Sequence, residues 1–136
     1  MTVFVDTSAL YALIDKDDRH HQAALAELAR LLEAQAPMLT TNYVLIEVLA
    51  LVQRRIGVAA VRGLCDDLLP ALGVEWISFE DHAAALAVLL AAGRRDLSFV
   101  DCTSFQIMRR LAIRDVLAFD PHFAEQGFGV RPVAGR

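Results

Sequence analysis

The chain has 136 residues, of which 56% are hydrophobic and 22% are charged, with only 4 Pro and 7 Gly. This length and composition predict one globular domain over residues 1–136 and exclude an intrinsically disordered chain. The formal net charge of −4 excludes a protein that coats nucleic acid by broad neutralisation of phosphates, but it allows an enzyme that contacts a few nucleotides.

The first 35 residues predict one strand and two helices. Residues 2–5 form a short run of β-branched and aromatic side chains, which is typical of a buried strand. We expect Thr7 or Ser8 to cap a short helix that ends near Ile14. Residues 19–35 carry apolar side chains at helical spacing and predict a second, longer helix.

The next segment predicts a strand and then two helices with no strand between them. Residues 38–40 form the strand, residues 41–55 form a helix closed by Gly57, and residues 58–69 form another helix. Two consecutive helices of this kind predict a helical hairpin that stands off the sheet. Its high apolar content predicts that part of the hairpin forms a groove for a partner.

The rest of the chain alternates strands with helices. We expect strands at residues 74–78, 116–119 and 129–133, and helices at residues 80–92 and 98–110. Strands separated by helices imply right-handed parallel crossovers. The sequence therefore predicts an α/β fold, a three-layer α/β/α sandwich with a mostly parallel sheet of four to five strands. Functional sites in such sheets form beyond the carboxyl ends of the strands.

Three Asp residues occupy positions where capping a helix competes with a role in such a site. Asp6 and Asp120 each follow a predicted strand directly, and Asp101 lies near the start of a predicted helix. Asp6 can cap the first helix, and Asp120 can cap a helix that begins with a proline. Asp101 can form a capping box with Ser98. Taken singly, capping is a sufficient explanation for each.

Glu47 is harder to explain as a surface residue, because its neighbours along the chain and around the helix are nearly all apolar. A carboxylate buried without a partner is unfavourable, so it normally becomes neutral or binds a cation. The alternative is an outward-facing Glu47 paired with an Arg. Arg54 and Arg55, however, lie beyond the i,i+4 spacing that favours helical pairs. A structural and a functional role stay equally open for this residue.

Taken together, the four acids predict a cation site. If the strands before Asp6 and Asp120 are adjacent, their carboxylates share one crevice, and a nearby helix start brings in Asp101. Two carboxylates repel each other by about 4 kcal/mol at about 4 Å and an effective dielectric constant of about 20. A cluster therefore requires a compensating ion or raised pKa values, and oxygen ligands favour Mg²⁺ or Mn²⁺ over zinc.

Four segments, each containing one of these acids, carry a further signal. They are Val5-Asp6-Thr7-Ser8, Tyr43-Val44-Leu45-Ile46-Glu47, Ser98-Phe99-Val100-Asp101 and Phe119-Asp120-Pro121-His122. In this order, over nearly the whole chain, they resemble the PIN-domain family and, within it, the VapC toxins of bacterial and archaeal toxin–antitoxin pairs.

The resemblance implies a parallel α/β/α fold and a Mg²⁺- or Mn²⁺-dependent endoribonuclease that hydrolyses RNA. It also implies a homodimer and a small VapB-like antitoxin that blocks the active site and binds its own operator. Carried over by position, Asp6 and Asp101 are the main metal ligands. Asp120 and Glu47 complete the catalytic acids, either as direct ligands or by holding a water on the ion.

Three further residues are candidates for contacts to the RNA. Arg94 and Arg95 suit phosphate binding, and His122 lies two residues beyond Asp120. The alternatives are a solvated charged face for the two Arg residues and a solvated helix start for His122, and we favour the solvated position in each case. Asp96 is expected to be a solvated loop acid at the mouth of the site.

Two other classes of function stay open: a catalytically idle partner of a DNA-binding repressor and a phosphate-directed signalling domain. A signalling domain of the receiver type needs an adjacent acidic pair after its first strand and a late lysine. Here Asp6 follows Val5, and Lys16 is the only lysine. The four intact acids argue against an idle partner.

The sequence also predicts the compartment. The first residues lack a basic segment followed by a long apolar one, so no signal peptide is expected. The longest apolar run, residues 83–92, is about half the ~20 residues that a membrane-spanning helix needs. Cys65 and Cys102 form neither a disulfide framework nor a zinc spacing. We therefore expect a cytoplasmic protein without membrane association.

Overall fold

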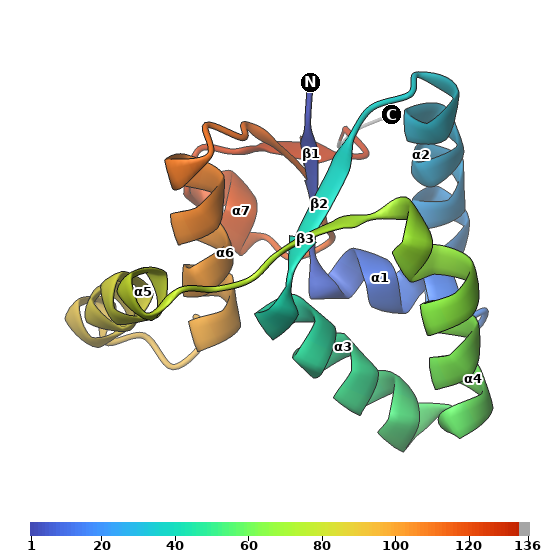
Figure 1. Cartoon of the computed structure of the whole chain (residues 1–136), viewed down its shortest axis with the longest axis horizontal. Coiled ribbons are helices and arrows are strands. Elements are labelled where there is room, and N and C mark those ends of the chain that lie inside the picture. Colours follow the sequence, from blue (N-terminus) through green and yellow to red (C-terminus); the bar gives the residue numbers. More distant parts are fainter. Residues whose placement is uncertain (134–136) are drawn as a thin grey trace.

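The computed structural model describes residues 1–133, and its centre is a sheet of five parallel strands (Figure 1). The strands are β1 (Val3–Val5), β2 (Met38–Thr41), β3 (Gly73–Glu75), β4 (Asp115–Leu117) and β5 (Gly129–Arg131). Their order across the sheet is β3-β2-β1-β4-β5, and each neighbouring pair is parallel. Because β1 lies beside β4, the segments that leave the carboxyl ends of these two strands start side by side.

Helices cover both faces of the sheet. They are α1 (Thr7–Ile14), α2 (His21–Glu33), α3 (Asn42–Arg55), α4 (Val58–Gly63), α5 (Phe79–Ala92), α6 (Phe99–Arg110) and α7 (His122–Glu125). In Figure 1, α1, α2 and α4 lie on one side of β1, and α5, α6 and α7 lie on the other. The predicted α/β fold is confirmed. Over residues 1–133, no helix is both long and apolar enough to cross a bilayer.

The core forms because strands and helices bury apolar side chains at periods that match their geometry. All three residues of β1 are buried, as expected for a central strand covered on both faces. The α3 helix buries Val44, Val48 and Val52, one residue per turn, and packs against α1 and α6. The predicted hairpin of α3 and α4 is present, but α3 is part of the core because this stripe packs inward.

Three strands end earlier than the apolar pattern predicts: β5 ends at Arg131 rather than at residue 133, and hydrogen bonds explain the other two. The strand predicted at residues 74–78 leaves the sheet before Ile77, whose backbone N–H donates to Asn42 Oδ1 at 2.8 Å. The strand predicted at residues 116–119 leaves it before Phe119, whose backbone N–H donates to Ser8 Oγ at 3.0 Å. In both places a polar side chain at the start of a helix accepts the hydrogen bond of the backbone N–H, so the chain leaves the sheet there.

The helix predicted at residues 58–69 is divided into three pieces. A π-helical turn (Leu64–Leu68) and a 3₁₀ turn (Leu69–Ala71) follow α4. Pro70 has no backbone N–H, so the α-helical hydrogen bonds cannot continue through it. The Leu69 N–H instead donates to the Leu64 carbonyl, five residues back.

Candidate metal and active site

Asp6 lies between β1 and α1, and only 2% of it is exposed. Its Oδ2 accepts hydrogen bonds from the Ser8 backbone N (3.2 Å) and Ser8 Oγ (2.7 Å), so Asp6, rather than Thr7 or Ser8, caps α1. Its Oδ1 is buried and accepts no hydrogen bond from residues 1–133. Burial raises the pKa of Asp6 to about 6, although the bonds from Ser8 lower it. A buried carboxylate oxygen without a donor suits a cation from outside the chain.

Asp101 lies in the first turn of α6. Ser98 caps this helix, and the Asp101 backbone N donates to Ser98 Oγ at 2.9 Å. The side chain of Asp101 is buried. Its pKa rises to about 7, first because of burial and then because of the negative charges of Asp6 and Asp120. The cap and the acidic site are thus compatible, because the backbone of Asp101 serves the cap while its carboxyl group faces the other acids.

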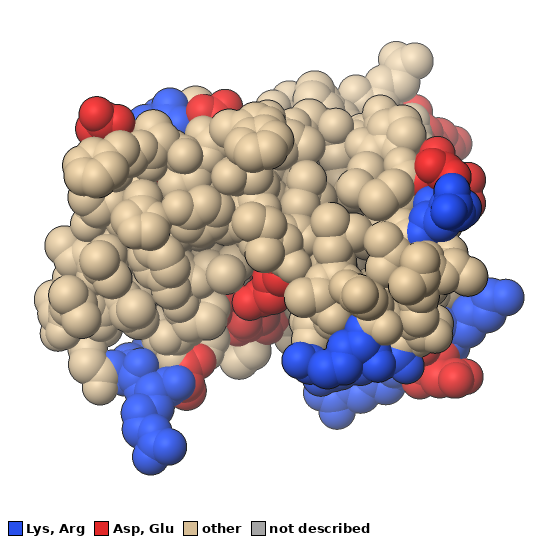
Figure 2. All heavy atoms as spheres, turned by 60° about the horizontal axis from the view of Figure 1, so that its bottom comes forward, with Lys and Arg blue, Asp and Glu red and all other residues tan. Residues whose placement is uncertain are grey.

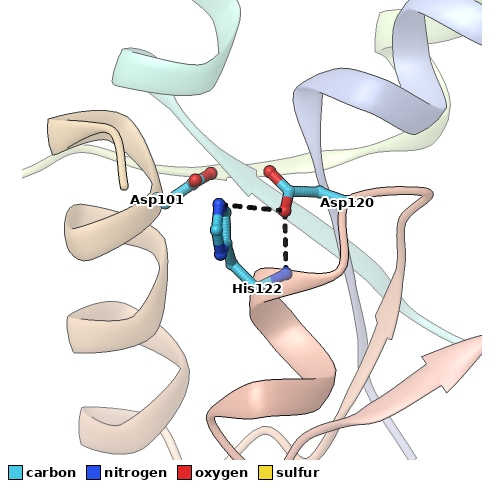
Figure 3. A group of neighbouring side chains, drawn as sticks. All are labelled: Asp101, Asp120 and His122. Atoms are coloured by element: carbon cyan, nitrogen blue, oxygen red, sulfur yellow. Dashed lines mark hydrogen bonds and ion pairs between the residues drawn. The ribbon is translucent and has the colours of Figure 1, made fainter. Parts of the chain in front are cut away.

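Asp120 lies three residues beyond the end of β4 and comes close to Asp101 and His122. The Asp120 Oδ1 accepts a hydrogen bond from the His122 backbone N at 2.8 Å. One ligand atom from each of these three side chains lies within 4.8 Å of the others. Figure 3 shows the carboxyl groups of Asp101 and Asp120 turned toward each other, with the imidazole of His122 beside them.

His122 is buried, with 8% exposed, which corrects the expectation of a solvated helix start. Its Nε2 lies 2.8 Å from the Asp96 carbonyl oxygen, and its Nδ1 lies 3.3 Å from Glu125 Oε2. Both ring nitrogens face acceptors, which suits an imidazole that carries two protons. Burial lowers the pKa of His122, but the Glu125 hydrogen bond and the Asp120 charge outweigh burial and raise it.

A doubly protonated His122 has no lone pair for a metal. In that protonation state only the carboxylate oxygens of the cluster can bind a metal, and their role as ligands stays a prediction. The positive charge of His122 offsets part of the repulsion between Asp101 and Asp120, and it lowers the pKa of Asp101 against the larger effect of burial. His122 therefore affects the acids through its charge, which favours the deprotonated form of Asp101.

Glu47 reaches the same cleft from α3. This cleft has a volume of about 610 Å³ and is lined by all four predicted acids, Asp6, Glu47, Asp101 and Asp120. Glu47 is half-buried in its wall. Asp96, at its edge, is exposed, as expected for a solvated acid. The fold thus brings together four carboxyl groups from distant segments; their roles as ligands and catalytic acids stay a prediction.

The two predicted phosphate-binding arginines lie beside the cleft rather than in its lining. Arg94 makes ion pairs with Asp96 (2.7 Å) and with Glu125 (3.1 Å). Arg95 is exposed, and neither residue lines the cleft. The carboxylates hold Arg94 in place, so a phosphate would have to compete with them for its N–H groups. RNA binding by Arg94 and Arg95 stays a prediction.

The cleft has basic lining residues that the sequence analysis missed: Arg19, His20 and Arg55. One signal could have indicated Arg55. It lies eight residues after Glu47 on the same helix, which is close to two full turns, and Leu51 between them also lines the cleft. No comparable periodicity marks Arg19 and His20, because they lie in the connection between α1 and α2.

Comparisons with known proteins identify the family to which these residues point. A family model described as "PIN domain" matches residues 3–129. The 23S rRNA-specific endonuclease VapC20 of Mycobacterium tuberculosis is 38% identical over 133 residues, which cover 96% of this chain and 98% of the relative. The residues that the family model matches include the positions of all four acids.

Comparison with solved structures also finds proteins of this fold. The crystal structure of the M. tuberculosis VapC20, described as a Sarcin-Ricin loop cleaving toxin, has a TM-score of 0.80 and 34% identity over 93% of this chain and 95% of that chain. VapBC2 from Rickettsia felis, bound to a DNA fragment from its promoter, has a TM-score of 0.72 and 13% identity over 96% and 98%. FitAcB from Neisseria gonorrhoeae has a TM-score of 0.68 and 14% identity over 96% of each chain. At such identities the last two show the fold alone.

Proposed function

The chain belongs to the PIN-domain family, and from this premise we propose that it is a Mg²⁺- or Mn²⁺-dependent endoribonuclease, the toxin of a VapBC-like pair. The observation that carries the proposal is the convergence of four carboxyl groups, with raised pKa values at Asp6 and Asp101, in one cleft. Four acids in one small volume repel one another unless a cation or protons compensate their charge.

The residues of the cleft fit a hard divalent cation. Asp6, whose Oδ1 lacks a hydrogen bond within residues 1–133, and Asp101 would hold it, and Asp120 and Glu47 would complete the set or hold water. Such an ion, when bound, lowers the pKa of water and neutralises charge on a phosphate. Glu47, on the wall formed by α3, would orient a water for attack on the scissile phosphate.

The substrate we propose is RNA, and the identity to a 23S rRNA-specific endonuclease favours ribosomal RNA. The cleft is open and polar enough for a nucleotide backbone. We do not favour the idle-partner alternative, because it does not explain why four carboxyl groups are gathered where burial and mutual repulsion raise the pKa values of Asp6 and Asp101. We do not favour the signalling alternative, because Asp6 has no adjacent acid and the only lysine, Lys16, lies early in the chain.

The partners that we propose are a small VapB-like antitoxin and a second copy of the chain. The similarity to VapC20, which is described as a toxin, supports an antitoxin. The exposed apolar side chains of α5, such as Phe79 and Leu90, support a homodimer. A toxin that acts on ribosomal RNA works in the cytoplasm.

The decisive experiment is cleavage of ribosomes and total RNA by the purified protein. We expect cleavage with Mg²⁺ or Mn²⁺, none with EDTA, and a loss of at least about 100-fold for Asp6→Asn or Asp101→Asn, because each variant removes a ligand charge. Asp66→Asn, in the exposed π-helical turn, is the matched control and should cleave normally. Equal cleavage under all of these conditions would exclude a metal-dependent nuclease.

Expression in cells tests the toxin assignment with the same variants. Wild-type protein should arrest growth, Asp6→Asn should not, and coexpression of the small protein encoded beside the gene should restore growth. Normal growth in the presence of active, soluble wild-type protein would contradict the toxin assignment but not the nuclease activity.

A further inference from the structure

The wall of the cleft formed by α3 and by the connection between α1 and α2 differs in charge from the acidic floor. It contains Arg19, His20 and Arg55 beside the acids Asp18 and Glu47, whereas the floor contains Asp6, Asp101 and Asp120. Figure 2 shows Asp and Glu side chains in a hollow near the middle of one face, with Lys and Arg side chains on both sides of it. The cleft is therefore an acidic centre with a basic wall, and we define Arg19, His20 and Arg55 as the basic wall.

Arg55 has N–H groups available to a ligand. Its guanidinium carbon lies 5.3 Å from the centre of the Tyr11 ring, a cation–π contact. Arg55 also interacts with the Tyr11 hydroxyl and, through its charge, with Asp15, which leaves part of its N–H donors for a ligand. Within residues 1–133, Arg55 makes no ion pair, in contrast to Arg94 and Arg110, each of which contacts two carboxylates. A guanidinium held in this way presents a rigid fork that matches a phosphate.

Arg19 and His20 extend the basic wall toward Asp120. The Arg19 Nε donates to His20 Nε2 at 3.1 Å. The His20 ring stacks on Phe119, with ring centres 4.3 Å apart and planes only 9° from parallel. Phe119 also lines the cleft and directly precedes Asp120. This stack places a flat ring, half-exposed to solvent, immediately beside a catalytic acid.

The charge of the cleft requires such a wall if the substrate is a polyanion. A cation among the acids can compensate the scissile phosphate, but the phosphates on either side also approach the negative floor. Each of them is repelled unless a positive side chain lies near it. Arg55 and Arg19 are the arginines that line the cleft, and neither makes an ion pair within residues 1–133.

We propose that Arg55 and Arg19 bind RNA phosphates next to the scissile one, and that His20, stacked on Phe119, receives an unpaired base of the same strand. The proposal rests on the proposed ribonuclease function and assigns substrate-binding residues to that site. Aromatic rings and arginines that alternate along a groove are the usual means of holding single-stranded RNA, because every base has a face that can stack.

The test measures RNA binding apart from cleavage. Asp101→Asn protein in EDTA is titrated against two fluorescent probes, a hairpin with the Sarcin-Ricin loop and a short oligouridylate, and anisotropy is followed over a range of salt. Adding Arg55→Ala should weaken binding about tenfold, the loss of one charge-assisted contact. It should also reduce the slope of log K against log salt by about 0.7, the value for one phosphate of a single strand.

Matched variants separate a phosphate contact from a general change of charge. Arg54→Ala and Arg62→Ala remove exposed arginines that do not line the cleft, and they should leave Kd and slope within about twofold of the parent. For the stack, His20→Ala should weaken binding several-fold and His20→Phe should restore it. Melting curves confirm that each variant is folded.

Two results would overturn the proposal. In the first, Arg55→Ala and Arg19→Ala bind RNA with the Kd and slope of Arg54→Ala. If wild-type protein still cleaves RNA, the nuclease proposal is retained and only RNA binding by the basic wall is rejected. If Arg55→Ala then fails to copurify with the antitoxin, the basic wall binds a protein instead. In the second, neither probe binds at any salt concentration. The proposed function itself fails only if the wild type cleaves no RNA with any divalent metal.

Discussion

The buried acids make the metal-free protein sensitive to pH. Asp6 has a pKa of about 6, raised by burial from an ordinary value of 3.8, and Asp101 has one of about 7. The folded state therefore binds these protons more tightly than the unfolded state, so their stabilisation is present below about pH 4 and is lost as pH rises through 6 to 7. For Asp6 the loss is on the order of 3 kcal/mol.

We predict from these values that the unfolding free energy in EDTA falls between about pH 4 and pH 7 for the wild type, and falls less for Asp6→Asn. At the upper pH the variant should be the more stable protein without metal, and Mg²⁺ should stabilise only the wild type. Urea unfolding across the pH range checks this, with Asp66→Asn to account for other titrating groups. Parallel profiles for wild type and Asp6→Asn would contradict it.

The sequence alone predicts the position and burial of some site residues but not of others. The positions of Asp6 and Asp101 follow from local signals, because a strand end and a helix cap are visible in a few neighbouring residues. The burial of His122 does not, because it depends on the Asp96 carbonyl, which lies 26 residues away in the chain. The ion pairs of Arg94 with Asp96 and Glu125 likewise require knowledge of how α7 approaches the loop before α6.

At the scale of elements, Ser8 joins the carboxyl ends of β1 and β4. Its Oγ donates to Asp6 Oδ2 at 2.7 Å and accepts a hydrogen bond from the Phe119 backbone N at 3.0 Å. Ser8 is thus a positioning residue that holds Asp6 and the segment of Asp120 together. The same bond ends β4 early, which the apolar pattern of residues 116–119 could not indicate, since the donor and acceptor are 111 residues apart.

We predict that Ser8→Ala shifts the pH dependence of metal binding and cleavage upward. The bond from Ser8 lowers the pKa of Asp6, so its loss raises that pKa, and a carboxyl group must be deprotonated to bind a cation. The midpoint should rise by up to about one pH unit. Mn²⁺ titrations over a pH series measure it. Ser8→Thr keeps the hydroxyl group and should retain the wild-type midpoint; an unchanged midpoint in Ser8→Ala would rule out this role.

At the scale of the whole molecule, the surface is asymmetric in its apolar residues. Phe79 is 82% exposed and Leu90 is 73% exposed, and both lie on α5 with Leu86 at helical spacing between them. Trp76, just before α5, is 74% exposed. Figure 2 shows a wide area without charged side chains on the side that α5 occupies in Figure 1. The partner surface predicted on the hairpin of residues 43–69 stays a prediction, since Ile46, Ile56 and Val58 are exposed there. The largest exposed aromatic side chains lie at α5, however.

This asymmetry predicts that the homodimer forms through α5. An apolar area of this kind is rarely left in water, and Trp76, Phe79 and Leu90 would form the apolar centre of an interface that buries about 800 Å² of each partner. Phe79→Asp or Leu90→Asp places a charge within that interface and should convert the dimer to a folded monomer. Light scattering after gel filtration measures the mass. Leu32→Asp, at an exposed position of α2, is the control and should stay dimeric. A wild-type monomer at all concentrations, or a dimer that Phe79→Asp and Leu90→Asp leave intact, would show that the apolar face of α5 serves another partner.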